Sequence, residues 1–412
     1  MTSEIIYYII IIFVAGEYAI SQWLDYRNRK AASPVLPASL GDLYDSAKYA
    51  TQQNYFKTKN RFSFYSTTFE TAIIILMITE GGFGKLSDAC FSLFPNGTIA
   101  NLVYFAVLFV AYELLTLPFD IYYTFVIEEK FGFNRTTPRT FLFDKLKELL
   151  LAFVFGGIIL ALIIYLYGLL GQNFWWAAFL VITAFSLIMT MFYSNIIVPL
   201  FNRQTPLPEG ELRDKIEAFS KKINFPLTGI YVIDGSKRTT KANAYFSGLG
   251  FKKRIVLYDT LVNEFTGDEL LSVLAHEMGH YRKKHTLWGF MLSATVNLLQ
   301  FYLLSLILGN TQVAVSLGAD APTFALSVIA FGLLFTPVNL LTSYLVNTFS
   351  RRNEYQADTF AGENGMGESL IAALKKLSVK SLSNLTPDPI YVKFYYSHPT
   401  LLQRIANIRS KK

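Results

Sequence analysis

The sequence has little cysteine and little charge for its length. Cys90 is the only cysteine among 412 residues, so the chain can form no intrachain disulfide and has no framework of thiols. Only 16% of the residues are charged while 52% are hydrophobic, and a soluble protein does not usually keep so much apolar surface away from water. This composition indicates that lipid forms part of the solvent.

A secretory signal is also missing. The N-terminal stretch MTSEIIYYIIIIF lacks a basic leading region and a small-residue cleavage site, so we interpret it as a retained membrane span. Seven stretches in all are long and apolar enough to cross a bilayer. They lie near residues 5–24, 62–80, 98–118, 148–169, 174–197, 286–308 and 323–346.

Basic residues are distributed unevenly between the loops that join these spans. The short loops 81–97, 170–173 and 309–322 contain only Lys85, and the long loops and the tail contain the other 36 of the 37 Lys and Arg residues. Because basic residues stay on the cytoplasmic side, we predict the N-terminus outside and the C-terminus inside. The net charge of +7 therefore reflects topology and attraction to anionic headgroups. No nucleic-acid recognition motif accompanies it, and we expect no nucleic-acid partner.

Six of the polar residues inside the predicted spans need an explanation. Interhelical hydrogen bonding is one explanation for them. The other is that the helices enclose a hydrated chamber, because ionisable groups at membrane depth normally face a protein interior or water. The six are Glu17, Glu70, Glu113, Asn195, Asn297 and Asn339.

Three of the four histidines lie in one short run, LAHEMGHYRKKH, at residues 274–285. The run sits on a predicted helix whose start has the capping-box spacing of Thr266 and Glu269. Residues four apart share a helix face, so His276 and His280 can bind one Zn²⁺, and Glu277 can activate a water beside them. A coincidental match on a surface helix is the alternative. His285 lies off this face, and we interpret it as a membrane-boundary residue rather than a ligand.

Catalytic zinc needs a third protein ligand, and the stretch SRRNEYQADTF after the last span offers one. Glu354 is the predicted third ligand, and Asp358, four residues on, can hold the second nitrogen of a ligand histidine. A solvated helix face is the alternative for both. His398 can donate to a developing oxyanion or simply form a turn before Pro399. Arg404 can do the same work or bind headgroups.

Between the fifth span and this helix the sequence has strand character. The segments GIYVID, KANAYF and KRIVLYDTL are rich in β-branched or aromatic residues and are separated by turn residues. A peptide substrate is commonly held by adding a strand to a sheet edge. Residues 242–246 are the candidate edge, with a buried core strand as the alternative.

The order of these motifs resembles the type I CAAX prenyl endopeptidases, which are integral-membrane gluzincin metalloproteases. The resemblance runs from about the third span to the C-terminus. It implies a mainly α membrane protein, with seven transmembrane helices forming a barrel around a water-filled chamber and a cytoplasmic-side zincin-like α+β metalloprotease domain. The stretches are LPFDIYYTFVIEEKFGFNRTT, VPLFNRQTPLPEGEL, KANAYFSGLGFKKRIVLYDTL, HEMGH, NEYQAD and SHPTLLQRI.

The resemblance also implies roles for individual residues. His276, His280 and Glu354 become the ligands of one Zn²⁺ per chain, and Glu277 becomes the catalytic base and acid. Asn243 and Ala244 are implied in contact with the substrate backbone. The active site would further include His398 and Arg404, with Asp358 behind the ligands. Members of this family remove the last three residues after an isoprenylated cysteine.

We therefore predict a zinc-dependent membrane endopeptidase that acts near the C-terminus of a prenylated or otherwise membrane-associated peptide. The predicted division has membrane helices in 1–197 and 286–346 and the metalloprotease domain in 198–285 and 347–412. Lean loops and isoleucine-rich spans favour a bacterial inner membrane over the endoplasmic reticulum. One alternative is a quality-control peptidase without prenyl specificity. Another is a transporter or lipid-binding protein whose structural zinc has His398 as a fourth ligand.

Overall fold

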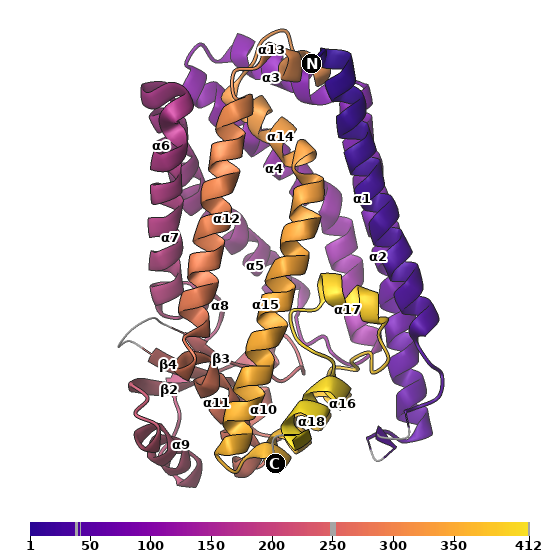
Figure 1. Ribbon diagram of the computed structural model, residues 1–412, viewed down its shortest axis with the longest axis vertical. Coiled ribbons are helices and arrows are strands. Elements are labelled where there is room, and N and C mark those ends of the chain that lie inside the picture. The colour runs from indigo at the N-terminus through magenta and orange to yellow at the C-terminus, as the bar shows by residue number, and fades with distance from the viewer. Residues whose placement is uncertain (38–39, 42, 248–252, 411–412) are drawn as a thin grey trace.

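The chain forms an elongated bundle of helices with a small sheet at one end (Figure 1). The computed structural model describes residues 1–37, 40–41, 43–247 and 253–410. The N-terminus lies at one end of the long axis beside α3 (Gly82–Leu93) and α13 (Thr311–Ser316), and the C-terminus lies at the opposite end. Termini at opposite ends agree with an odd number of membrane crossings.

Helices cover all seven stretches that the sequence predicts as spans. By length and composition, five helices of the described chain can cross a membrane, or six if one bent pair forms a single span. The barrel of seven spans around a chamber stays a prediction. The helices concerned are α1 (Ser3–Ala31), α2 (Ser46–Thr79), α4 (Gly97–Tyr122), α5 (Pro138–Leu151), η3 (Ala152–Gly156), α6 (Gly157–Leu170), α7 (Phe174–Ile196), α12 (His285–Ile307), α14 (Phe324–Leu334) and α15 (Thr336–Glu363).

The count of five treats Pro138–Phe201 as one helix of 64 residues, but this segment reverses direction. A straight helix of that length would measure about 96 Å, roughly three times the hydrocarbon core. Instead α6 and α7 pack against each other across the 3₁₀ turn η4 (Gly171–Asn173). Gly171 adopts φ +56° there, a conformation that glycine takes without a side-chain clash.

The last predicted span, 323–346, is not one straight helix. Its two parts, α14 and α15, meet at an angle of 60°. Pro337 lies in the first turn of α15 and has no N–H to donate to the preceding turn. The hydroxyl of Thr336 donates instead to the carbonyl of Leu333, at 2.9 Å. Beyond this bend α15 runs unbroken to Glu363, well past the predicted span.

A four-stranded sheet lies beside the bundle at the C-terminal end. Its order is β1 (Gln204–Pro206), β2 (Leu227–Ile233), β4 (Lys253–Tyr258) and β3 (Ala244–Ser247), with β2 and β4 parallel and the outer strands antiparallel to their neighbours. The predicted edge is confirmed, because β3 is an outer strand of the described sheet, and the core-strand alternative is wrong. β1 was not predicted, since three residues ending in proline carry no alternating pattern. Residues 248–252 of the family-like stretch lie outside the described residues.

The other helices pack around this sheet into a shared hydrophobic core. Buried side chains from α2, α9, β4, α11, α16 and α18 meet there, Tyr55, Ile216, Ile255, Leu270, Leu370 and Ile408 among them. The predicted domain boundaries are not tested by this packing and stay predictions. The helices are α8 (Val198–Phe201), α9 (Glu211–Lys222), η5 (Gly235–Lys237), α10 (Asp259–Val262), α11 (Gly267–Arg282), α16 (Gly367–Lys380), α17 (Pro389–Tyr395) and α18 (Leu401–Ser410).

The stretch EEKFGFN holds the chain that leads into β3. It follows the π-helix η2 (Tyr123–Glu128), which continues α4. Asn134 forms an isolated bridge with Thr239, and the N–H of Thr240 donates to the carbonyl of Phe133 at 3.1 Å. Lys241 forms an ion pair with Glu128. The extramembrane edge strand is thereby tied directly to a membrane helix.

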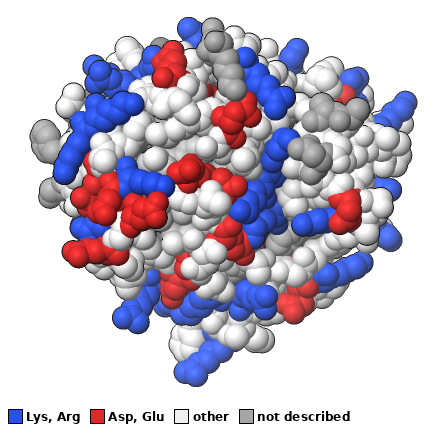
Figure 2. Space-filling view, turned by 90° about the horizontal axis from the view of Figure 1, so that it is seen from below, with Lys and Arg blue, Asp and Glu red and all other residues white. Residues whose placement is uncertain are grey.

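The positions of Lys and Arg in the structure agree with the predicted membrane orientation, which itself stays a prediction. Figure 2 shows the end of the molecule that carries the sheet, with Lys and Arg side chains spread around it and Asp and Glu among them. Lys85 lies on α3, at the opposite end. Of the acids in the spans, Glu113 lies 3.5 Å from the amine of Lys145 on α5, an interhelical contact. Glu17 and Glu70 line neither of the two cavities described below.

Helix α11 carries the histidine run and packs closely on α15. The predicted capping box is confirmed, because the Thr266 hydroxyl accepts from the Glu269 N–H and the Glu269 carboxylate accepts from the Thr266 N–H. Gly279 makes the close packing possible, since a Cβ there would lie 3.1 Å from the Cα of Ala357.

We predict that Gly279→Ala destabilises the fold by about 1–3 kcal/mol, because the added methyl group forces α11 and α15 apart. The measurement is the thermal unfolding midpoint in detergent. Gly289→Ala is the control, since a Cβ at Gly289 on α12 meets nothing within 4 Å. Equal midpoints for the two variants would show that the α11–α15 contact accommodates the added methyl group, and would contradict the prediction.

Candidate metal centre

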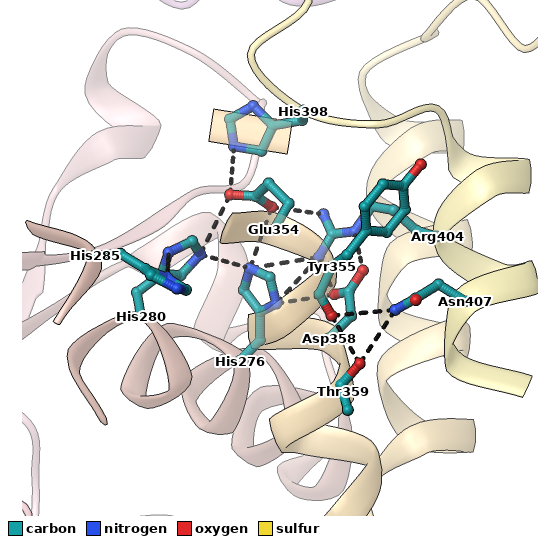
Figure 3. Close-up of polar contacts among 10 residues, drawn as sticks. All are labelled: His276, His280, His285, Glu354, Tyr355, Asp358, Thr359, His398, Arg404 and Asn407. Carbon is teal, nitrogen blue, oxygen red and sulfur yellow. Dashed lines mark hydrogen bonds and ion pairs between the residues drawn. The ribbon is translucent and has the colours of Figure 1, made fainter. Parts of the chain in front are cut away.

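Three side chains from two helices converge on one point (Figure 3). His276 and His280 come from α11, and their Nε2 atoms lie 3.2 Å apart. Glu354 comes from α15, with Oε2 3.4 Å from Nε2 of His276 and Oε1 3.2 Å from Nε2 of His280. The sequence predicted these three residues as ligands, and the fold brings them together.

This group has the composition and geometry of a metal site. One donor atom from each residue lies within 4.8 Å of the others. Oε2 of Glu354 is buried, yet it has no hydrogen-bond partner among the described residues. Two imidazoles and one carboxylate are a ligand set of catalytic zinc, which keeps a fourth position for water or substrate. His398 is not part of the group, so the structure does not supply the fourth protein ligand of a closed site.

Asp358 and Arg404 lie behind His276. Nδ1 of His276 lies 2.9 Å from Oδ1 of Asp358, so the proton on Nδ1 is donated there and Nε2 is left for a metal. Asp358 is fully buried, and Arg404 binds both of its oxygens, Nε to Oδ2 at 2.9 Å and Nη2 to Oδ1 at 2.6 Å. Arg404 is also largely buried, so it does not face lipid headgroups.

The surroundings of His276 favour positive charge on its ring. Burial and the positive charge of Arg404 lower the pKa of His276, but the adjacent carboxylates of Asp358 and Glu354 outweigh them and raise its pKa to about 9. The same two carboxylates that attract a proton also attract a metal cation.

His285 supports His280 in a similar way, which the sequence interpretation as a membrane-boundary residue missed. It is not a ligand, but it is buried, and its Nδ1 lies 3.1 Å from Nδ1 of His280. Its Nε2 donates to Oε1 of Gln356 at 2.9 Å, so Nδ1 accepts the proton of His280. Helical spacing hid this contact. Helix α11 ends at Arg282, and Lys284, with φ +58°, turns the chain so that α12 returns His285 to the site.

The metal group opens into a cavity of about 1510 Å³, hereafter the catalytic cavity. Glu277, His280, Glu354 and His398 line it. Nε2 of His398 lies 3.4 Å from Oε1 of Glu354, and its imidazole is 63% exposed, so the ring is free to reach a ligand in the cavity. Two of the predicted catalytic residues, Glu277 and His398, thus line one cavity. The third, Arg404, lies behind His276.

The edge strand β3 lines the same cavity through Tyr245 and Phe246, and Asn243, just before the strand, lines it too. Tyr258 donates its N–H to the carbonyl of Asn243, and Ala244 pairs with Leu257 in antiparallel register. Since antiparallel pairs alternate, Ala244 directs its backbone carbonyl away from β4. The Ala244 N–H donates to the side chain of Asn243, at 2.9 Å. One backbone acceptor is thus available to a peptide at this edge.

Family models match nearly the whole chain. Residues 25–203 match the CAAX prenyl protease N-terminal region with five membrane helices, and residues 206–412 match peptidase family M48. The CAAX prenyl protease 1 of Saccharomyces cerevisiae is 34% identical, with 95% of this chain and 93% of that protein covered. The human homolog of this protease is 31% identical, with 98% and 95% covered.

A crystal structure of Ste24p from S. mikatae has the same fold. Its TM-score is 0.91 at 33% identity, and 98% of each chain is covered. These relatives come from yeasts and human, and they argue against the bacterial membrane that the composition of the spans favoured.

We predict that His285→Ala weakens Zn²⁺ binding by about 10–100-fold, because His280 loses the partner that fixes its ring and tautomer. Competition with a chromogenic chelator measures this affinity without any substrate. His285→Gln retains an acceptor for His280 and should recover most of the affinity. Lys283→Ala, at an exposed position of the same turn, is the control. Unchanged affinity in His285→Ala would contradict the prediction.

Proposed function

Because this chain belongs to peptidase family M48, with the N-terminal membrane region of the CAAX prenyl proteases, we propose that it is a zinc-dependent integral-membrane endopeptidase. It cleaves near the C-terminus of prenylated or membrane-associated peptides. One observation carries the proposal: two histidines and a glutamate meet at a large cavity that also contains an edge strand and a glutamate, Glu277.

One Zn²⁺ per chain fits the three ligands His276, His280 and Glu354. When bound, it supplies Lewis acidity that polarises the scissile carbonyl and makes water more acidic. Because no fourth protein ligand among the described residues belongs to the group, the site is suited to catalysis rather than to structure. This argues against a transporter or lipid-binding protein with a structural zinc.

Glu277 performs the proton transfers. It follows His276 directly on α11 and lines the catalytic cavity, so its carboxylate reaches a water held beside the scissile carbonyl. It accepts the proton of the attacking water and then passes it to the leaving amine. Asp358 and His285 hold the two ligand histidines in the tautomers that leave Nε2 available.

The substrate peptide adds to β3 as an antiparallel strand. The carbonyl of Ala244 accepts from the peptide backbone, and the side chain of Asn243 lies at the entry to this edge. His398 donates to the oxyanion from the cavity side. Arg404 acts through its charge, because its Nε and Nη2 already donate to Asp358 and its Nη1 lies 3.6 Å from Glu354.

In the membrane, seven helices form a barrel around a water-filled chamber. Helices over all seven predicted stretches, the reversal between α6 and α7 and the opposite ends of the termini support this count. The distribution of Lys and Arg supports a metal centre on the cytoplasmic side and an N-terminus outside. Eukaryotic relatives favour the endoplasmic reticulum membrane over a bacterial one.

We expect Glu277→Ala to retain Zn²⁺ but to lower kcat by at least about 1000-fold, because the water loses its base. Metal analysis of the purified variant and peptide cleavage measure the two effects separately. Asp268→Asn is the control, since Asp268 lies exposed at the start of the same helix. Cleavage by Glu277→Ala at the normal rate would exclude this mechanism.

Prenyl specificity is tested with a fluorogenic farnesylated CAAX peptide and its unprenylated copy, with detergent-purified protein. We expect kcat/KM to favour the farnesylated copy by at least about tenfold, because the prenyl chain adds apolar surface that binding buries. A zinc chelator should abolish cleavage of both. Equal cleavage of the two copies would instead support a quality-control peptidase without prenyl specificity.

A further inference from the structure

A second cavity adjoins the catalytic cavity at the side chain of His398, which lines both. It measures about 600 Å³ and lies between α1 and α2 on one side and the C-terminal segment around α17 on the other. Arg404, Tyr55 and Lys59 are among its lining residues. None of the roles assigned above accounts for this space.

We propose that the second cavity receives the residues downstream of the scissile bond, and that Lys59 binds the C-terminal carboxylate of the substrate. The inference rests on the proposed endopeptidase function and adds how the end of the chain is recognised. Two features carry it: an ammonium group without an ion-pair partner, and the direction that β3 imposes on a bound peptide.

Lys59 is held in position without being neutralised. Its Nζ lies over two aromatic rings, 5.2 Å from the centroid of Tyr55 and 6.0 Å from that of Tyr123. No Asp or Glu in the described parts of the chain forms an ion pair with it. Asp25 lines the same cavity from α1, but beyond ion-pair distance of Lys59. The side chain of Lys59 is exposed, and the cavity is the space that it borders.

Glu128, the carboxylate whose charge acts on Lys59, already has its own partners. Glu128 forms an ion pair with Lys241 and accepts a hydrogen bond from the hydroxyl of Tyr55. Lys241 also lies 3.2 Å from that hydroxyl. Around Tyr55, the charge of Glu128 balances that of Lys241. The positive charge of Lys59 is left over, and Lys59 lines the second cavity.

The direction of β3 leads a substrate to the same place. A peptide that pairs antiparallel with β3 runs from the Ser247 end toward the Ala244 end, so its C-terminal residues leave past Asn243. The chain before Asn243 leads to Lys241, which contacts Tyr55 on the wall of the second cavity. Three extended residues span about 10 Å. A three-residue tail that leaves past Asn243 therefore extends toward Tyr55 and Lys59.

The two cavities divide the substrate by chemistry. The residue upstream of the scissile bond, with its prenyl chain, remains in the larger catalytic cavity. The tripeptide tail enters the smaller one, whose volume lies in the range of about 300–1,000 Å³ usual for small ligands. A carboxylate at the end of the tail meets the ammonium group of Lys59, which forms no ion pair with the described residues. An enzyme built this way measures distance from the C-terminus as well as reading the prenyl group.

The test compares two farnesylated peptides of one sequence, one with a free C-terminal carboxylate and one with a C-terminal amide. For the wild-type protein we expect kcat/KM to be about tenfold higher for the acid, mainly through KM, as for one charge contact. Lys59→Met should lose this preference by slowing cleavage of the acid alone. Lys57→Met is the matched control, because Lys57 lies exposed on the same helix and lines neither cavity.

Each other outcome overturns the inference. Equal wild-type cleavage of acid and amide shows that the carboxylate is not recognised. An equal loss for both peptides in Lys59→Met shows that Lys59 supports the fold. An acid preference that survives in Lys59→Met places the recognition elsewhere. If the wild-type protein cleaves neither peptide, the proposed endopeptidase function fails, and this inference fails with it.

Discussion

Gly279 and Ala357 bring α11 and α15 together, and the metal centre depends on this distance because its ligands are divided between the two helices. His276 and His280 share one face of α11 through helical periodicity alone. The third ligand, Glu354, joins them only because the helices approach to the limit that a glycine permits. The partners of the ligands follow from the same contact, since Asp358 and Gln356 are also on α15. The close contact between α11 and α15 therefore positions both the metal ligands and the residues that orient them.

A second constraint connects the catalytic edge to the membrane. The chain before β3 is bonded to the stretch after α4 through Asn134 and Thr239, and through Lys241 and Glu128. The edge strand is thus held by the segment that continues α4, and the third metal ligand is held by α15. Relative movement of these membrane helices would change the spacing between bound peptide and metal. A rigid bundle is accordingly part of the catalytic apparatus, in keeping with the need to hold reacting groups to fractions of an ångström.

The parts of the molecule that the sequence predicted are those with local signals. Hydropathy located the helical stretches, Thr266 and Glu269 marked the start of α11, and the spacing of His276 and His280 identified their common face. The features that the sequence did not predict depend on the path of the chain between helices. The left-handed Lys284 returns His285 to the site, and Pro337 bends α14 away from α15. Arg404 was a candidate, but no local signal indicates its contact with Asp358, which is 46 residues away.

Because α15 is continuous, the position of the metal ligand Glu354 depends on the tilt of this helix. The helix runs without a break from its bend at Pro337 to Glu354, a length of about 26 Å for 17 helical steps. At the end of such an arm, a tilt of about 5° about the bend moves the carboxylate by roughly 2 Å, the length of a metal–ligand bond. Membrane thickness and lateral pressure act on helix tilt. A change in the bilayer that tilts α15 would therefore change the coordination geometry at Glu354.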